Sequence, residues 1–132
     1  MSGSGTADDP WVLTTPSGGS EYRMHYDPDA GLLVCQVGKT RLTYLSRALD
    51  DLHAWLTEQG YWVLLGGADE QKPAAEGTVE AWGRAENNPV GGWYGQKKGL
   101  RGRFGVYVPP VLVEQGRAEI KVESRKAYAR AL

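Results

Sequence analysis

The sequence has little of what metal sites and covalent catalysis usually require. It contains one cysteine and two histidines among 132 residues. A single cysteine excludes an internal disulfide, and neither CxxC nor HExxH spacing is present. The longest apolar runs, 32–35 and 62–65, are far shorter than the roughly 20 residues that cross a bilayer. We therefore expect no metal, no cofactor and no membrane partner.

The few residues that could serve as nucleophile or base are poorly placed for that role. Cys35 lies in the apolar run LLVCQV, where a buried and inert thiol is typical. His25 is predicted on the outer face of a strand, and His53 in the middle of a helix. A Cys–His pair formed in space stays open, because separation in sequence does not limit distance. The sequence nevertheless favours a protein that is not an enzyme.

One short motif resembles part of a nucleotide-binding loop. GKT at 38–40 matches the end of the phosphate-binding loop, but that loop needs a glycine at the position of Leu33. The phosphate-binding loop also leads into a helix, whereas a strand is predicted after Thr40. We therefore predict that Gly38 and Lys39 form a hairpin turn.

The first residues lack the pattern of an export signal. MSGSGTADD has no basic start followed by an apolar stretch, so we expect no signal peptide and a flexible tail over residues 1–10. The lone cysteine fits a cytoplasmic protein, because stable disulfides are rare in that compartment.

The chain does have enough apolar material for a core. Its hydrophobic fraction is 41%, with five tryptophans, which argues against wholesale disorder. A chain of this length buries roughly two thirds of its unfolded surface on folding and needs no covalent staple.

The net charge of −1 conceals an uneven distribution along the chain. Residues 1–96 carry six Lys/Arg and thirteen Asp/Glu, a balance of −7. Residues 97–132 carry nine Lys/Arg and three Glu, a balance of +6. Such asymmetry is a hint of an anionic partner for the basic part. Attraction between the two parts of the chain is the alternative explanation, and both stay open.

Residues 11–66 are predicted to begin with an antiparallel meander. EYRMHY alternates, with Tyr22 and Met24 on one face, which is typical of a half-buried strand. LLVCQV is apolar on both faces and is expected in the centre of the sheet. Closely spaced turn residues favour hairpin connections. The expected strands are 11–15, 21–26, 32–37 and 41–45.

A helix and a returning strand are predicted to complete this part. Ser46 is the expected N-cap and Gly60 the expected stop, with a leucine stripe between them. YWVLL at 61–65 then returns to the sheet. Together these elements predict an α+β fold.

A polar connection over 67–77 is the best internal boundary, and residues 78–132 follow it. Thr78 is expected to cap a short helix, VEAWGRAE. Pro109 and Pro110 suit the first turn of another helix, because that turn needs no backbone N–H. We predict two subdomains, 11–66 and 78–132, or one compact domain overall.

The last third is expected to end in a hairpin. Gly116 ends the preceding helix, and strands 118–123 and 126–132 flank a turn at SRK. The element order of residues 78–132 resembles a winged helix-turn-helix, which implies a DNA-binding protein with a regulatory role. In that family the second helix enters the major groove and the hairpin touches the backbone or the minor groove. The helix after Pro110 reads VLVEQ, however, which offers little for reading base edges.

Another resemblance extends over most of the chain. The text EGTVEAWGR…NPVGGWYG…KKGLRGRFG…YVPP…GRAE, with DDLHAWL at 50–56, is similar to a small uncharacterised family from actinobacterial-type genomes. That resemblance implies a bacterial protein and assigns no activity and no site residue.

The stretch GGWYGQKKGLRGRFGVYVPP, at 91–110, carries the candidate site. Four glycines at spacings of three, four and three would line one face of a helix, or would supply positive φ to a loop. In either conformation the basic side chains lie close together, where they can neutralise phosphates. The predicted nucleic-acid-binding residues are Lys97, Lys98, Arg101, Arg103, Arg125 and Lys126.

Three functions follow as hypotheses. The first is a non-enzymatic, nucleic-acid-associated protein that binds DNA or another nucleic acid through its basic third. The second is a protein-interaction adaptor, whose basic part packs on its own acidic part. The third is a small-molecule-binding domain with an aromatic pocket. The pocket would be lined by Trp55, Trp62, Trp82 and Trp93.

Overall fold

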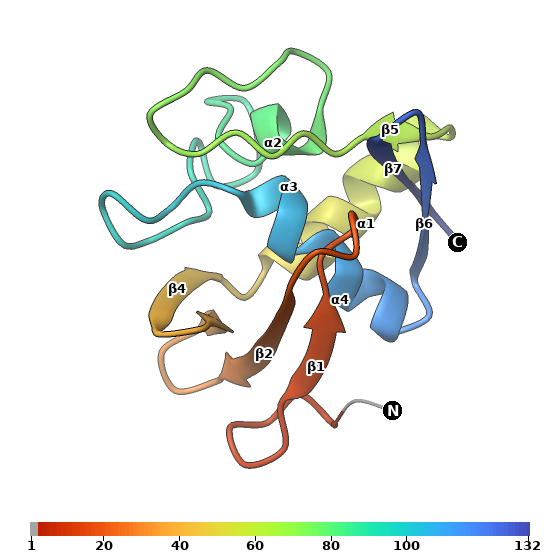
Figure 1. The fold of residues 1–132 in the computed structure, drawn as a ribbon. Coiled ribbons are helices and arrows are strands. Elements are labelled where there is room, and N and C mark those ends of the chain that lie inside the picture. The colour runs from red at the N-terminus through yellow and green to blue at the C-terminus, as the bar shows by residue number, and fades with distance from the viewer. Residues whose placement is uncertain (1–2) are drawn as a thin grey trace.

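Two antiparallel sheets flank a group of short helices in the computed structural model, which describes residues 3–132 (Figure 1). The first sheet contains β1 (Trp11–Thr14), β2 (Glu21–Asp27), β3 (Leu32–Val37) and β4 (Thr40–Leu45). The second sheet contains β5 (Val63–Leu64), β6 (Ala118–Glu123) and β7 (Lys126–Ala131). The helices are α1 (Ala48–Gln59), α2 (Val79–Trp82), α3 (Phe104–Tyr107) and α4 (Pro109–Glu114). The predicted α+β class, with an N-terminal meander, is confirmed.

The first sheet is a meander in the order β1-β2-β3-β4. Its turns follow from the sequence: Gly38 has φ 58° between β3 and β4, so GKT forms the hairpin turn that was predicted. The alternation in β2 also holds, with Tyr22 and Met24 buried against the helices and Arg23 exposed. Cys35 is buried in the central strand β3, as its apolar run predicts, and that burial raises the pKa of its thiol.

Helix α1 packs its leucine stripe into the core. Leu49, Leu52 and Leu56 are fully buried, and the chain leaves the helix at Gly60, whose φ of 68° is the left-handed conformation expected there. The predicted N-cap at Ser46 is wrong: Arg47 is the N-cap, and no side chain caps the helix. The Arg47 guanidinium instead forms an ion pair with the Asp51 carboxylate, one turn further along the helix, at 2.8 Å.

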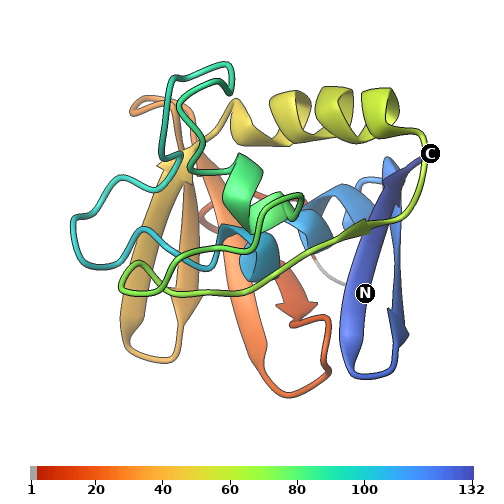
Figure 2. The same cartoon turned by 90° about the horizontal axis from the view of Figure 1, so that it is seen from above.

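The second sheet joins the middle of the chain to its last residues. Its order is β5-β7-β6, with Val63 opposite Ala129. Of the strand predicted at 61–65, only two residues pair. Figure 2 shows this sheet at one end of the molecule and the meander at the other, with α1 extending along one side from the end of β4 to the second sheet.

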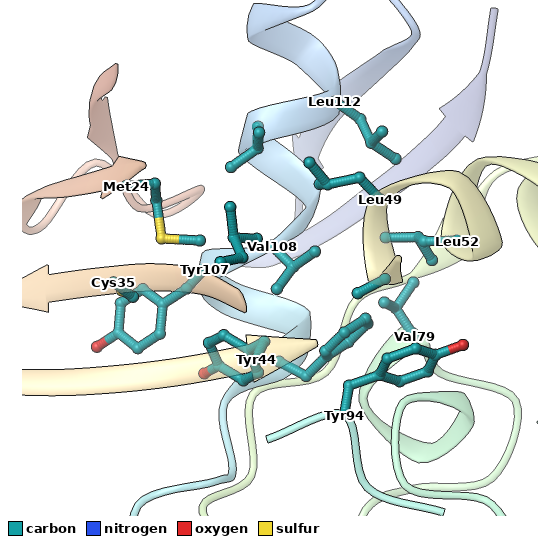
Figure 3. Packing of buried hydrophobic residues seen from close by; sticks show 14 of the residues in the cluster. Met24, Cys35, Tyr44, Leu49, Leu52, Val79, Tyr94, Tyr107, Val108 and Leu112 are labelled. Atoms are coloured by element: carbon teal, nitrogen blue, oxygen red, sulfur yellow. The ribbon is translucent and has the colours of Figure 1, made fainter. Parts of the chain in front are cut away.

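One hydrophobic cluster fills the space between these layers (Figure 3). It takes side chains from the meander, from α1 and from all three short helices, so the segments predicted as two subdomains share a single core. The buried tyrosines are satisfied: the Tyr22 hydroxyl donates to the Tyr107 carbonyl and the Tyr44 hydroxyl to the Gly102 carbonyl, both at 2.8 Å. Among residues 3–132, every buried side-chain nitrogen and oxygen has a hydrogen-bond partner.

Two of the three short helices, α2 and α4, begin where the sequence predicts, whereas α3 lies in a stretch for which no such helix was predicted. The Thr78 hydroxyl accepts the Ala81 N–H at 3.1 Å, which confirms the cap of α2. Pro109 and Pro110 occupy the first turn of α4, as their missing N–H groups allow. Both prolines are buried, with Val111 and Leu112, so most of α4 lies inside the protein.

The start of the described chain folds back on the meander. The Tyr26 N–H donates to the Gly5 carbonyl at 2.8 Å, and Gly5 packs on the Trp11 ring. Residues 3–10, expected as part of a flexible tail, are therefore tied to β2; Met1 and Ser2, the rest of that tail, lie outside the described residues. No helix in the described part of the chain combines the length and apolarity needed to traverse a bilayer.

Candidate nucleic-acid interface

The candidate site is the segment Gln96–Arg103, called here the basic loop. Its conformation is irregular, so the alternative in which its glycines line a helix face is wrong. At its tip the Leu100 N–H donates to the Lys97 carbonyl at 2.9 Å, and Gly99 has φ 84°. A positive φ at the third residue of a four-residue turn is what type II geometry requires. The glycine therefore shapes the tip that carries Lys97 and Lys98.

The first end of the basic loop is held against the edge of the meander. The Leu45 N–H donates to the Tyr94 carbonyl and the Gln96 N–H donates to the Thr43 carbonyl, both at 2.9 Å. Gly95 lies between these bonds, and a Cβ there would stand 2.3 Å from the Arg101 carbonyl oxygen. Only glycine permits this approach, so the loop closes back on itself.

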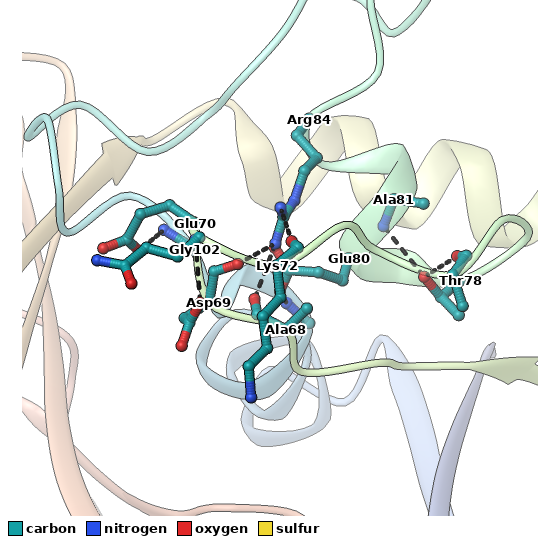
Figure 4. Close-up of polar contacts among 12 residues, drawn as sticks. Ala68, Asp69, Glu70, Lys72, Thr78, Glu80, Ala81, Arg84 and Gly102 are labelled. Atoms are coloured by element: carbon teal, nitrogen blue, oxygen red, sulfur yellow. Dashed lines mark hydrogen bonds and ion pairs between the residues drawn. The ribbon is translucent and has the colours of Figure 1, made fainter.

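The other end is held by residues 66–77, called here the strap (Figure 4). A Glu70 carboxylate oxygen accepts the Gly102 N–H at 3.2 Å, and the Ala68 carbonyl accepts the Arg103 N–H at 3.3 Å. The carbonyl oxygen of Gly102 also accepts a hydrogen bond from the Tyr44 hydroxyl. Both ends of the basic loop are therefore fixed to the fold.

The strap is itself fixed by Arg84, which follows α2. Its guanidinium donates to the strap carbonyls of Ala68 at 2.8 Å, Asp69 at 3.2 Å and Lys72 at 3.0 Å. The same group donates to a Glu80 carboxylate oxygen at 2.9 Å. Figure 4 shows Arg84 reaching from the end of α2 to the strap backbone.

Glu80 completes this network from inside the protein. Only 1% of it is exposed, and its second carboxylate oxygen accepts the Gly105 N–H at 3.0 Å. Burial raises the pKa of Glu80, while the hydrogen bonds from Gly105 and Arg84 act in the opposite direction. With both oxygens occupied, the carboxylate joins the strap to α3 and takes no part in the surface of the site.

The structure places the predicted cations of the loop together and mostly in solvent. Lys97, Lys98 and Arg103 are exposed, and Arg101 is half-buried with its guanidinium 4.5 Å from the centre of the Trp93 ring. Within residues 3–132, none of these four forms an ion pair with a carboxylate. The loop therefore presents cations that an external anion can reach.

Arg125 and Lys126, the other two predicted residues, are exposed at the turn between β6 and β7. Figures 1 and 2 both show this turn on the opposite side of the molecule from the basic loop. The six predicted residues therefore form two separate basic sites, not one patch.

The turn that carries Arg125 is strained. Ser124 has φ 50° and Arg125 has φ 66°. These two residues form the turn between Glu123 and Lys126, which are strand partners in β6 and β7. Two positive φ values are typical of a type I′ hairpin, which favours Asn-Gly. We expect the S124N/R125G double substitution to raise the free energy of unfolding by about 1 kcal/mol, measured by urea denaturation. Arg125→Lys is the control, and an unchanged midpoint in the double variant would contradict this account.

The four tryptophans proposed as a pocket lining lie in different environments. Trp55 stacks on Trp82 within the core, with ring centres 5.2 Å apart. Trp62 lies under Lys121 and Arg130, and Trp93 contacts two guanidinium groups. None of the four lines the cavities found near the strap, the meander or the second sheet.

Sequence reasoning missed the network that positions the loop. Glu80 and Arg84 are four residues apart, a spacing at which helical side chains meet, and this was the available signal. Nothing in the sequence pairs either of them with the strap. Elsewhere among the described residues, no group of three or more His, Cys, Asp or Glu side chains could hold a metal ion.

The fold and this surface define an α+β protein of two antiparallel sheets with a fixed, exposed basic loop. Over residues 3–132 the chain matches the model of a family of unknown function, DUF6855, and it belongs to that family. No curated protein and no solved structure matches it.

Proposed function

We propose that this protein is a non-enzymatic, nucleic-acid-associated protein that contacts phosphates through the basic loop. The observation that carries the proposal is the exposure of Lys97, Lys98 and Arg103 on a loop fixed at both ends, with none of the three in an ion pair among residues 3–132. A fixed loop loses less conformational entropy on binding than a mobile one, so more of the charge attraction remains as affinity.

Phosphate contact by these cations gives affinity without sequence preference. Each neutralised phosphate releases counterions, and three contacts on duplex DNA correspond to a log–log salt slope of about −3. Arg101 adds a guanidinium held on an indole ring, an arrangement that also suits stacking on an unpaired base.

The proposal uses the loop in place of a recognition helix. In a winged helix-turn-helix the second helix reads bases, but α4 has six residues and its first four are buried. The β6–β7 hairpin, which would be the wing, pairs with β5 and lies away from the loop. A bacterial and cytoplasmic setting belongs to the same proposal, supported by the family resemblance and by the free thiol of Cys35.

The adaptor hypothesis receives less support. It requires the basic third to pack on the acidic part of the chain, and one of the five ion pairs within residues 3–132 does so, between Arg117 and Asp50 at 2.8 Å. Under that hypothesis the Lys97→Glu/Arg101→Glu variant loses stability, because the two cations would lose their partners. We expect its free energy of unfolding to fall by no more than about 1 kcal/mol, the cost of losing the contact between Arg101 and the Trp93 ring.

The proposal is tested by fluorescence anisotropy of labelled duplex and single-stranded DNA between about 50 and 200 mM salt. We expect Lys97→Gln/Lys98→Gln to weaken binding about tenfold at the lower salt concentration and to reduce the magnitude of the salt slope by about 2. Arg125→Gln/Lys126→Gln removes equal charge at the other basic site and is the matched control. No anisotropy change at micromolar protein would overturn the proposal, as would equal losses in both variants.

A further inference from the structure

An open cavity lies next to the turn between β6 and β7, and Arg125 and Lys126 line it. It has a volume of about 340 Å³, within the range of small-molecule sites. Four segments meet around it: residues 15–17 after β1, residues 64–67 at the start of the strap, Gly105–Val106 in α3, and residues 125–127 at the start of β7. Segments this far apart in sequence form a wall only in the folded protein.

Most of the cavity wall is apolar. Leu64 and Leu65 from β5 and its continuation, Val106 from α3 and Pro16 from the β1–β2 turn supply it. Val106 is half-buried, so part of its side chain is open to the cavity. When an apolar group covers an apolar wall that is in contact with water, binding is favoured by about 25 cal/mol for each Å² of apolar surface that is buried.

One side of the cavity is cationic and rich in hydrogen-bond donors. Arg125 and Lys126 line it, and neither pairs with a carboxylate among the described residues. Gly66 and Gly67 also line it, and no acceptor within residues 3–132 takes the backbone N–H of either glycine. A backbone N–H without a protein acceptor is free to donate a hydrogen bond to a small anion.

Two hydroxyl groups complete the polar side. Thr15 and Ser17 line the cavity, with their side-chain oxygens 3.4 Å apart. A hydroxyl can donate to an anion while it accepts from the backbone, as Thr15 does from the Ser20 N–H at 3.2 Å. The donors available for one anion are thus two cations, two amides and one hydroxyl of the Thr15–Ser17 pair, whose other proton joins the two oxygens, against an apolar wall.

We propose that this cavity binds a small organic carboxylate with an aliphatic body, of the size of a medium-chain fatty acid. The carboxylate would lie against Arg125, Lys126 and the two glycine amides, and the aliphatic part would cover Val106 and its apolar neighbours. This binding is independent of the proposed nucleic-acid function, since the basic loop contributes no residue to the cavity.

The test is a titration of ¹⁵N-labelled protein with octanoate, followed by NMR. Octanoate is expected to shift the amide signals of Gly66, Gly67, Gly105 and Val106 in a saturable manner, and to leave those of the basic loop unchanged. Octanol, which has the same chain and no charge, is expected to bind at least about tenfold more weakly, because charge-assisted hydrogen bonds to the carboxylate are lost. Equal binding of octanol, or no saturable shift at these four amides, would overturn the proposal.

Two variants and a matched control locate the site. Arg125→Gln/Lys126→Gln removes both cations and is expected to weaken octanoate binding about tenfold while leaving octanol unchanged. Val106→Phe fills the cavity and is expected to weaken both ligands. Arg23→Gln/Lys39→Gln removes one arginine and one lysine that are exposed on the first sheet, outside the cavity, and is the control. Octanoate affinity equal in Arg125→Gln/Lys126→Gln and in this control would assign the binding to general charge and overturn the proposal.

Discussion

Glu80→Ala is expected to lower the free energy of unfolding by about 3–5 kcal/mol, the cost of removing one partner of a buried charged pair. Glu80 is the one charged residue that is buried among residues 3–132, and Arg84 and the Gly105 N–H both donate to its carboxylate. Alanine leaves the guanidinium without its carboxylate and leaves the Gly105 N–H without an acceptor. The loss is a large fraction of the 5–15 kcal/mol that typically stabilises a domain.

Urea denaturation followed by tryptophan fluorescence measures this loss. Glu80→Gln retains an acceptor for Gly105 and is expected to lose less, so it stays measurable even if the alanine variant does not fold. Glu119→Ala is the surface control: it removes a carboxylate that pairs with Arg130 in solvent, and the expected change is below about 0.5 kcal/mol. A loss below about 1 kcal/mol in Glu80→Ala would show that the network does not support the fold.

Tyr94→Ala is expected to cost about 3–5 kcal/mol, the range for deleting a buried aromatic side chain. The ring is fully buried and stacks between Trp82 and Phe104, with both pairs of ring centres 5.3 Å apart. Its removal leaves a cavity next to the residues that begin the basic loop. Thermal and urea denaturation measure the loss in stability.

Tyr94→Phe separates the ring from its hydroxyl group. The hydroxyl donates to Asp51 at 2.8 Å, so phenylalanine removes one hydrogen bond and keeps the stacking, at a cost of about 1 kcal/mol. Similar losses in the alanine and phenylalanine variants would show that the aromatic packing contributes little, contrary to this account.

Most secondary structure could be predicted because the sequence encodes it locally. The alternation of Tyr22 and Met24, the turn at Gly38 and the cap at Thr78 each depend on neighbours a few residues away. The prediction failed where geometry depends on distant segments. The strand at 61–65 pairs over only two residues, because β7 supplies its partners from the other end of the sequence.

The sequence left open whether the cations of the candidate site face solvent or pair with the acidic part of the chain. Lys97, Lys98 and Arg103 are exposed and Arg101 is half-buried, and the sequence could not show that Arg125 and Lys126 lie on the opposite side of the molecule. Nor can it show that Glu80 and Arg84 hold the strap, since an i, i+4 pair is usually a surface feature. Spatial separation and burial arise from the tertiary fold, which brings together residues far apart in the chain.

The pairing of β5 with β7 also determines when the molecule can finish folding. Residues 63–64 cannot form their strand pairing until residues 128–129 have been synthesised, and about half of the sequence is made between these two partners. The meander and α1 contain only contiguous residues and can form earlier, but Ala129 is a fully buried member of the core that they face. A growing chain on the ribosome therefore exposes one side of that core until translation has passed residue 129.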